Sequence, residues 1–164
     1  MEAAKIKLRT SDDIVVETDK AVMMRSVFIK SFFDNEEIPL PEVSKHILDK
    51  IIMYLTYIHA GNAEPETEKP LRSNKLKDLT TEWFAYYIDI DVDTLQDLLN
   101  TSSYLDINLL KSICCAQLGS IIRGLTLEEF RKMFNIRNDF TPEEEVIPFT
   151  EDDLNAASRL MKKT

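Results

Sequence analysis

The stretch TLEEFRKMFNIRNDFTPEEE, residues 126–145, decides how the second half of the chain folds. Thr126 and Glu129 have the spacing of a capping box, in which each side chain accepts from the other residue's backbone amide, so a helix is expected to begin here. Thr141 followed by Pro142 predicts a second helix start, because proline fits the first helical position. The stretch is also rich in large apolar side chains, namely Leu127, Phe130, Met133, Phe134, Ile136 and Phe140. Such short helices carry more apolar side chains than a single side packed on a core can bury, so we expect a partner to cover the remainder.

Directly upstream, residues 106–123 predict a long helix with apolar residues on two sides. One stripe consists of Leu110, Ile113, Cys114 and Ile121, and a second, rotated stripe consists of Cys115, Leu118 and Ile122. A surface helix needs one apolar stripe of about 100°, so the second stripe predicts an internal helix or one covered by a partner. Gly124 follows, where we expect a left-handed cap.

The first half of the chain mixes short strands with helices. We expect a hairpin over 6–9 and 14–17, followed by a helical stretch that runs from Thr18 and Asp19 to about Asn35 and breaks near Ser26. After it we expect an edge strand or loop over 38–41, and then a helix from Ser44 to near Gly61. Within the helical stretch that breaks near Ser26, one side carries apolar residues at helical spacing, namely Val27, Phe28, Phe32 and Phe33. Residues 61–78 predict a flexible connection, followed by helices over 81–89 and 93–104, the second capped by Asp93, and by a last helix over 154–161.

Composition excludes several classes of function. The chain has 164 residues, a formal net charge of −9 and only three glycines, so neither a glycine-rich phosphate loop nor a nucleic-acid-binding surface is expected. Two cysteines and two histidines are too few for a structural zinc site, and no apolar run reaches membrane-spanning length. We therefore expect a cytoplasmic and nuclear protein that is not an enzyme and binds no metal, cofactor, nucleic acid or membrane.

Several separated motifs, in the right order, carry a family resemblance. They are IKL (6–8), SVFIKSFF (26–33), IPLPEV (38–43), Trp83 eleven positions before Thr94, YLDINLL (104–110) and, most specifically, the core NI-R-NDF (135–140) followed by acidic residues. Together they resemble the Skp family of S-phase-kinase-associated adaptors, the F-box-binding subunits of SCF ubiquitin ligases. The resemblance implies an α/β fold, with a BTB/POZ-like domain of a small sheet and helices followed by a carboxyl-terminal helical extension. Its parts would be 1–60 and 79–123 for the BTB/POZ-like domain, 61–78 for the linker and 124–164 for the extension.

The resemblance also implies a non-catalytic adaptor that links a cullin to F-box substrate receptors. We expect the F-box surface to contain Cys115, Leu118, Ile122, Phe130, Phe134, Ile136 and Phe140, with Asn138 and Asp139 as a polar pair between the apolar anchors. Truncating an aromatic anchor in such a surface costs about 2 kcal/mol or more. Two simpler alternatives stay open: that the apolar residues pack within the monomer, and that Asn138 and Asp139 merely form a turn.

For the cullin side, the resemblance points to two short segments. They supply Pro39, Leu40, Pro41 and Val43, and the dipeptide Ser103-Tyr104, where the family has Asn-Tyr. Tyrosine suits an interface because its ring is apolar and its hydroxyl forms hydrogen bonds. Pro142 occupies a place where some protist relatives carry a hydroxylated and then glycosylated proline, although a helix-opening proline explains the residue without modification.

Two other interaction proteins are alternatives to this function. One is an elongin-C-like adaptor, which the extension over 126–145 argues against, because elongin C ends before that region. The other is a homodimeric BTB-type structural component, for example at a kinetochore. For the adaptor itself, a weak homodimer of the free chain is a further expectation.

Overall fold

The computed structural model describes residues 4–32, 34–63, 80–139 and 141–145. The chain divides into two compact units, Met1–Gly124 and Leu125–Thr164. Most of the connection expected over 61–78 and the last helix expected over 154–161 lie outside the described residues, as do Phe33 and Phe140.

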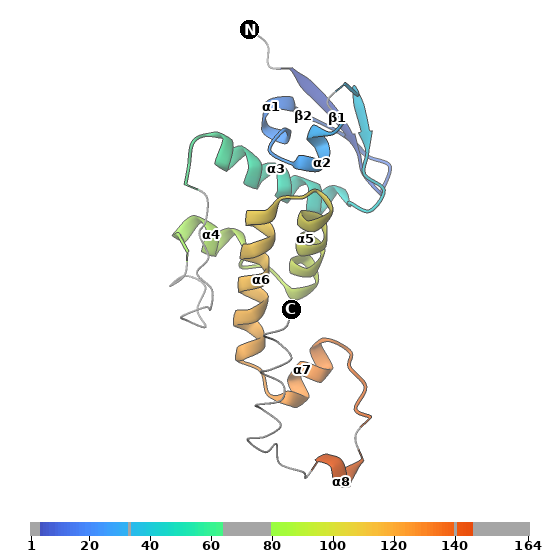
Figure 1. The fold of residues 1–164 in the computed structure, drawn as a ribbon, viewed down its shortest axis with the longest axis vertical. Coiled ribbons are helices and arrows are strands. Elements are labelled where there is room, and N and C mark those ends of the chain that lie inside the picture. The colour runs from blue at the N-terminus through green and yellow to red at the C-terminus, as the bar shows by residue number, and fades with distance from the viewer. Residues whose placement is uncertain (1–3, 33, 64–79, 140, 146–164) are drawn as a thin grey trace, which may run out of the picture. The chain divides into compact units, whose positions relative to one another are not determined.

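A small sheet begins the first unit (Figure 1). Strands β1 (Lys5–Arg9) and β2 (Val15–Asp19) pair antiparallel, and β3 (Glu37–Pro39) pairs parallel with β1, giving the order β2-β1-β3. Side chains alternate along β1, with Ile6 and Leu8 buried, because successive residues of a strand point to opposite faces. The predicted hairpin is confirmed, and the Pro-Leu-Pro segment begins as an edge strand, as the sequence indicated.

The helical stretch after the hairpin is broken at Ser26, as predicted. Helix α1 (Lys20–Met23) and helix α2 (Val27–Lys30) are separate, and each has its own side-chain cap. The Ser26 hydroxyl accepts a hydrogen bond of 3.2 Å from the amide of Ile29, which starts α2 in a new direction. Because α2 ends at Lys30, the prediction that this stretch reaches Asn35 as helix is wrong.

Helix α3 (Lys45–His59) forms the centre of the first unit. It packs against α1 on the side of the sheet and against α5 (Val92–Tyr104) on the other side (Figure 1). Its buried residues recur at helical spacing: Ile47, Leu48, Ile51, Tyr54, Leu55 and Ile58. The helix ends at His59, and Gly61 then adopts a φ of +89°, a conformation that glycine reaches without strain.

Three further helices belong to the described part of the unit, and two predictions about their ends are corrected. Helix α4 (Glu82–Tyr87) precedes α5, and α6 (Asn108–Arg123) lies beside α5 (Figure 1). Asp91, not Asp93, caps α5, because its carboxylate accepts from the amide of Thr94 at 2.8 Å. Gly124 has a φ of −85°, so its amide closes the last turn of α6 in right-handed geometry and no left-handed cap forms.

A sharp turn joins α5 to α6. Asp106 has a φ of +52°, and its carboxylate accepts a hydrogen bond of 2.9 Å from the side-chain amide of Asn108. Aspartate tolerates this left-handed conformation better than most residues. Helix α6 therefore begins at Asn108, two residues later than predicted, and the turn leaves Ser103 and Tyr104 at the very end of α5.

In the second unit, helix α7 (Leu127–Met133) begins with the predicted capping box. The hydroxyl of Thr126 accepts from the amide of Glu129 at 3.3 Å, and the carboxylate of Glu129 accepts from the amide of Thr126 at 2.8 Å. Helix α8 (Pro142–Glu145) starts at the predicted proline. Among the described residues, every buried apolar side chain belongs to the first unit, between Ile6 and Ala116.

Candidate functional site

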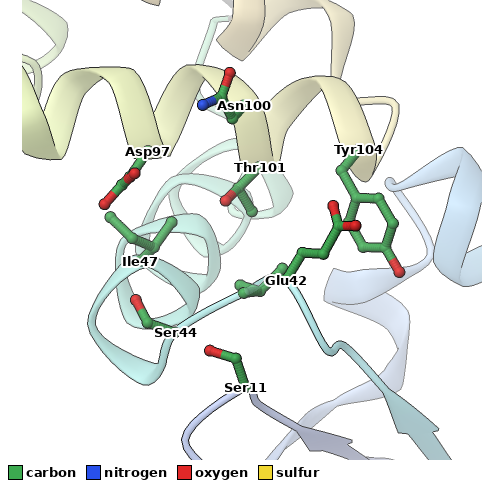
Figure 2. Close-up of a pocket in the computed structure, with 9 residues that line it drawn as sticks. Ser11, Glu42, Ser44, Ile47, Asp97, Asn100, Thr101 and Tyr104 are labelled. Atoms are coloured by element: carbon green, nitrogen blue, oxygen red, sulfur yellow. The ribbon is translucent and has the colours of Figure 1, made fainter.

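A pocket of about 280 Å³ lies between α5, the segment that enters α3 and the turn after β1 (Figure 2). Its lining consists of Ser11, Glu42, Val43, Ser44, Ile47, Asp97, Asn100, Thr101 and Tyr104. The residues from α5 are spaced at about one helical turn, so they share one face of that helix. The pocket brings Tyr104 and Val43 together, although they are 61 positions apart in the sequence.

Tyr104 stands at one end of this pocket. Its ring is half-buried and packs on the ring of Phe28, with centroids 4.7 Å apart. Burial raises the pKa of the Tyr104 hydroxyl, and the negative charge of Glu42 raises it further. The side chain of Glu42 extends toward the Tyr104 ring (Figure 2). The phenol therefore stays protonated and offers a partner a neutral hydrogen-bond donor.

The six residues expected on the cullin side divide into two groups. Pro39, Pro41 and Ser103 are exposed, and Tyr104 is half-buried. Leu40 and Val43 are fully buried in the core, so their side chains do not reach the surface, and their place on the cullin side stays a prediction. The reason is that side chains alternate between two faces along β3 and the two residues after it. Ile38 and Leu40 therefore point inward, and Pro39 and Pro41 point outward.

Helix α6 shows both predicted stripes. Leu110, Ile113 and Cys114 are buried, and Ile121 packs against the core. Burial raises the pKa of the Cys114 thiol to about 12, so this cysteine is an inert core residue. On the second stripe Cys115 is exposed and Ile122 is half-buried, whereas Leu118 is half-buried and packs against the core, as Ile121 does. The second stripe thus reaches the surface and leaves apolar atoms available to a partner.

The second unit leaves its apolar side chains largely uncovered. Phe130 and Phe134 are half-buried and contact each other, with ring centroids 4.9 Å apart. Leu127 and Ile136 are 62% and 47% exposed. None of residues 125–139 and 141–143, whose burial the structure describes, is buried, so within the described chain these side chains are not core residues.

The polar residues expected beside these anchors are at the surface. Asn138 lines a hollow of about 510 Å³ together with Glu128, Arg131, Lys132, Asn135 and Ile136. Asp139 is exposed, and Phe140 lies outside the described residues. The turn of this stretch lies at Phe134 and Asn135, and Asn135 is left-handed, with a φ of +52°. Asn138 and Asp139 lie after this turn. Pro142 is exposed at the start of α8.

Sequence reasoning missed most residues of the Tyr104 pocket. Glu42, Asp97 and Thr101 were not singled out, because the pocket draws on three segments that only the tertiary fold brings together. One signal was available: Asp97, Thr101 and Tyr104 follow each other at spacings of four and three, which places them on one side of a predicted helix.

The described ranges contain neither a candidate metal site nor a candidate membrane-spanning helix. Between residues 4 and 145, apart from the gaps given above, no three histidine, cysteine, aspartate or glutamate side chains are grouped so as to hold a metal ion. None of the helices within those ranges is both long and apolar enough to cross a membrane.

Comparisons with known proteins match both units. Residues 4–60 match the Skp1 family, tetramerisation domain, and residues 108–146 match the Skp1 family, dimerisation domain. The "S-phase kinase-associated protein 1 homolog" of Tetrahymena thermophila is 38% identical over 148 residues, which cover 87% of this chain and 89% of that protein.

Two further relatives are similar over the same extent. The "SCF ubiquitin ligase complex protein SKP1a" of Dictyostelium discoideum is 37% identical over 85% of this chain and 88% of its own length. The "E3 ubiquitin ligase complex SCF subunit sconC" of Arthroderma benhamiae is 34% identical over 86% of this chain and 88% of its own length. The sheet with its helices, the two family domains and these relatives agree, and the chain belongs to the Skp1 family.

Proposed function

We propose that this chain is the adaptor subunit of an SCF ubiquitin ligase, which joins the amino-terminal domain of a cullin to F-box substrate receptors. The observation that carries the proposal is the aromatic pair Phe130 and Phe134, which is only half-buried and lies in a segment that matches the Skp1 family domain over 108–146. Two of the relatives are named as subunits of SCF ubiquitin ligase complexes.

The F-box receptor would be held by apolar burial. Cys115, Leu118 and Ile122 supply the outer stripe of α6, and Phe130, Phe134 and Ile136 supply the anchors of the second unit. Aromatic side chains that become fully buried in a complex commonly contribute most of the binding energy. Asn138 and Asp139, with Phe140 next to them in sequence, would orient the receptor from the edge of this surface.

The cullin would bind the Tyr104 pocket and its rim. Tyr104 supplies an aromatic ring and a neutral hydroxyl, and Pro39, Pro41 and Ser103 supply exposed neighbours. Leu40 and Val43 would act indirectly, since their burial holds the segment between β3 and α3 in place. The acidic Glu42 and Asp97 favour a partner surface with basic side chains.

In this role the chain positions substrate receptors, and the ubiquitin chemistry belongs to other subunits. Cys115 is the one exposed thiol among the described residues, and no histidine forms a contact with it that would suggest a nucleophile and its base. We place the adaptor in the cytoplasm and nucleus, because two free, adjacent cysteines suit a reducing compartment. Fractionation of cells that express a tagged chain tests this location.

Two variants test the function, one for each surface. Tyr104→Lys should abolish co-purification with the cullin domain while F-box binding is retained, and Phe130→Ala should do the reverse. Loss of both partners in either variant would indicate misfolding, and circular dichroism of the same samples detects it. Retention of both partners by both variants would contradict the proposal.

An elongin-C-like function fits less well. The match to the Skp1 family domain runs over 108–146 and includes the extension after α6, which elongin C does not have. Light scattering on the chain alone separates the adaptor from a homodimeric BTB-type protein: a stable homodimer that ignores an F-box segment would favour the latter.

A further inference from the structure

A stack of aromatic rings joins α3 to α4 in the first unit. The ring of Trp83 lies nearly parallel to the ring of Tyr57, with centroids 3.7 Å apart, and to the ring of Tyr87, with centroids 5.1 Å apart. Phe84 contacts Tyr57 and Trp83 edge-on, at centroid distances of 5.6 Å and 4.9 Å. Phe84 and Tyr87 are buried, whereas Tyr57 and Trp83 are half-buried. The stack therefore begins in the core and reaches the surface.

Two exposed side chains extend this stack across the surface. Tyr86 is 85% exposed, and no other large hydrophobic side chain among the described residues is as exposed. Met53 on α3 is 55% exposed. Tyr86 follows Trp83 by three positions, and Tyr57 follows Met53 by four, so the members of each pair are neighbours on the surface of their helix. We call Met53, Tyr57, Trp83 and Tyr86 the aromatic face.

The aromatic face is fixed before any partner binds. The hydroxyl of Tyr87 donates a hydrogen bond of 2.9 Å to the carbonyl oxygen of Lys50, which joins α4 to α3. The buried ring of Phe84 anchors α4 in the core. Rings that are positioned in advance lose less conformational entropy when a partner covers them. No residue of the face lines the Tyr104 pocket or the hollow at Asn138, so it is separate from both surfaces of the proposed function.

Acidic side chains border the face on the side of α4. Glu82 precedes Tyr86 by four positions, and the amide of Asp89 donates to the carbonyl oxygen of Tyr86 at 3.3 Å. Both acidic residues are exposed. The sequence has no lysine or arginine over 80–110, although Lys50 stands three positions before Met53 on α3. The most exposed ring of the face, Tyr86, thus lies between two carboxylates.

We infer that the aromatic face binds a segment of a partner protein that carries an arginine. The guanidinium group stacks on the ring of Tyr86 and pairs with the carboxylate of Glu82, while apolar neighbours of the arginine cover Met53. Aromatic rings attract cations to their faces, and a carboxylate binds a guanidinium group through two parallel hydrogen bonds. Lysine lacks this planar group, so arginine fits a ring beside a carboxylate better. The inference goes beyond the adaptor function and does not depend on it.

Charge argues against a second copy of this chain as the occupant. In a symmetric dimer the aromatic face meets itself, so Glu82 and Asp89 of each copy approach the same acidic residues of the other. Like charges that face each other across an interface are unfavourable, and the chain carries a net charge of −9. A segment that carries an arginine removes this repulsion, and a second copy does not.

Trp83 is the one tryptophan of the sequence, so tryptophan fluorescence of the full chain reports on this face directly. The probe is a capped peptide of alternating leucine and arginine, compared with a leucine and lysine peptide of the same length. We expect the arginine peptide to change the emission of Trp83 and to bind more tightly than the lysine peptide. Tyr86→Ala should weaken binding of the arginine peptide about tenfold, and Glu82→Gln about threefold.

Two substitutions on other elements serve as matched controls. Leu109→Ala removes a side chain that is 38% exposed on α6, and Glu36→Gln neutralises an exposed carboxylate just before β3. Both variants should bind the arginine peptide as tightly as the unsubstituted chain. Tyr86→Lys, which keeps a long side chain and repels arginine, replaces Tyr86→Ala if circular dichroism shows that the alanine variant is unfolded.

Three results would overturn the inference. The first is unchanged emission of Trp83, or equal binding of the arginine peptide by Tyr86→Ala and the unsubstituted chain. The second is equal affinity for the two peptides, which would reduce the effect to a general attraction between a basic peptide and an acidic chain. The third is a homodimer, detected by light scattering, that dissociates in Tyr86→Ala, because it would assign the face to a second copy.

Discussion

The Ser26 hydroxyl donates a hydrogen bond of 2.6 Å to the carbonyl oxygen of Leu105, across 79 positions of sequence. Both residues are fully buried, and the same hydroxyl accepts from the amide of Ile29. One serine therefore caps α2 and satisfies a carbonyl group at the end of α5. It ties the start of α2 to the end of α5, next to Tyr104.

Replacing this serine should destabilise the first unit. In Ser26→Ala the carbonyl oxygen of Leu105 and the amide of Ile29 lose their partner while buried, which costs about 1–3 kcal/mol. Urea unfolding followed by circular dichroism measures the loss. Ser31→Ala is the matched control, because the Ser31 hydroxyl also donates to a backbone carbonyl, that of Phe28, but at an exposed position. Equal effects of the two substitutions would mean that the contact with Leu105 adds nothing.

The aromatic pair of the second unit should matter for binding and not for stability. Phe134→Ala is expected to weaken the affinity for an F-box segment by about 2 kcal/mol, roughly 30-fold, because a buried aromatic anchor is lost. Calorimetry measures this change. The midpoint of thermal unfolding should stay within about 1 °C, since Phe134 is not part of the core. A lower midpoint with unchanged affinity would instead place the ring in a core.

The two neighbouring cysteines should react very differently. Burial raises the pKa of Cys114 to about 12, so near neutral pH this residue remains a buried, protonated thiol. Cys115 is exposed. Mass spectrometry after brief iodoacetamide treatment should find alkylation at Cys115 alone, with protection when an F-box segment is bound. Alkylation of Cys114 under native conditions would show that α6 opens, and reaction of Cys115 in the complex would place it outside the interface.

Helix α7 should weaken in acid. Hydrogen bonds from the backbone amide and the hydroxyl of Thr126 lower the pKa of Glu129 below its ordinary value of 4.5. A lowered pKa in the folded state means that the capping box is fully effective above 4.5 and is lost as the pH falls through the lower folded value. NMR titration of the amides of α7 follows this loss. In Glu129→Gln the acid dependence should largely disappear, whereas Glu128→Gln should keep it.

Local signals in the sequence were sufficient for most elements of the fold. The capping box at Thr126, the break at Ser26 and the hairpin all depend on neighbouring residues, and the structure confirms each of them. One error occurs where two residues both fit the same role. Asp91 and Asp93 both fit a helix start, and the choice of Asp91 follows from its hydrogen bond to Thr94, which sequence alone does not reveal.

The candidate site was less accessible to sequence reasoning. Tyr104 was found through the resemblance, but its neighbours Glu42 and Phe28 come from distant segments and meet it only in the folded chain. The burial of Leu40 was predictable, since alternation along β3 places it on the same face as Ile38. The two-sided pattern of α6 was visible directly, because it depends only on helical spacing.

The central claim is that one copy of this chain binds a cullin and an F-box receptor at the same time. Size-exclusion chromatography with light scattering, on a mixture of the chain, a cullin amino-terminal domain and an F-box segment, measures this directly. We expect a single species whose mass equals one copy of each component. Displacement of one partner by the other, or a homodimer of the chain that binds neither, would contradict it.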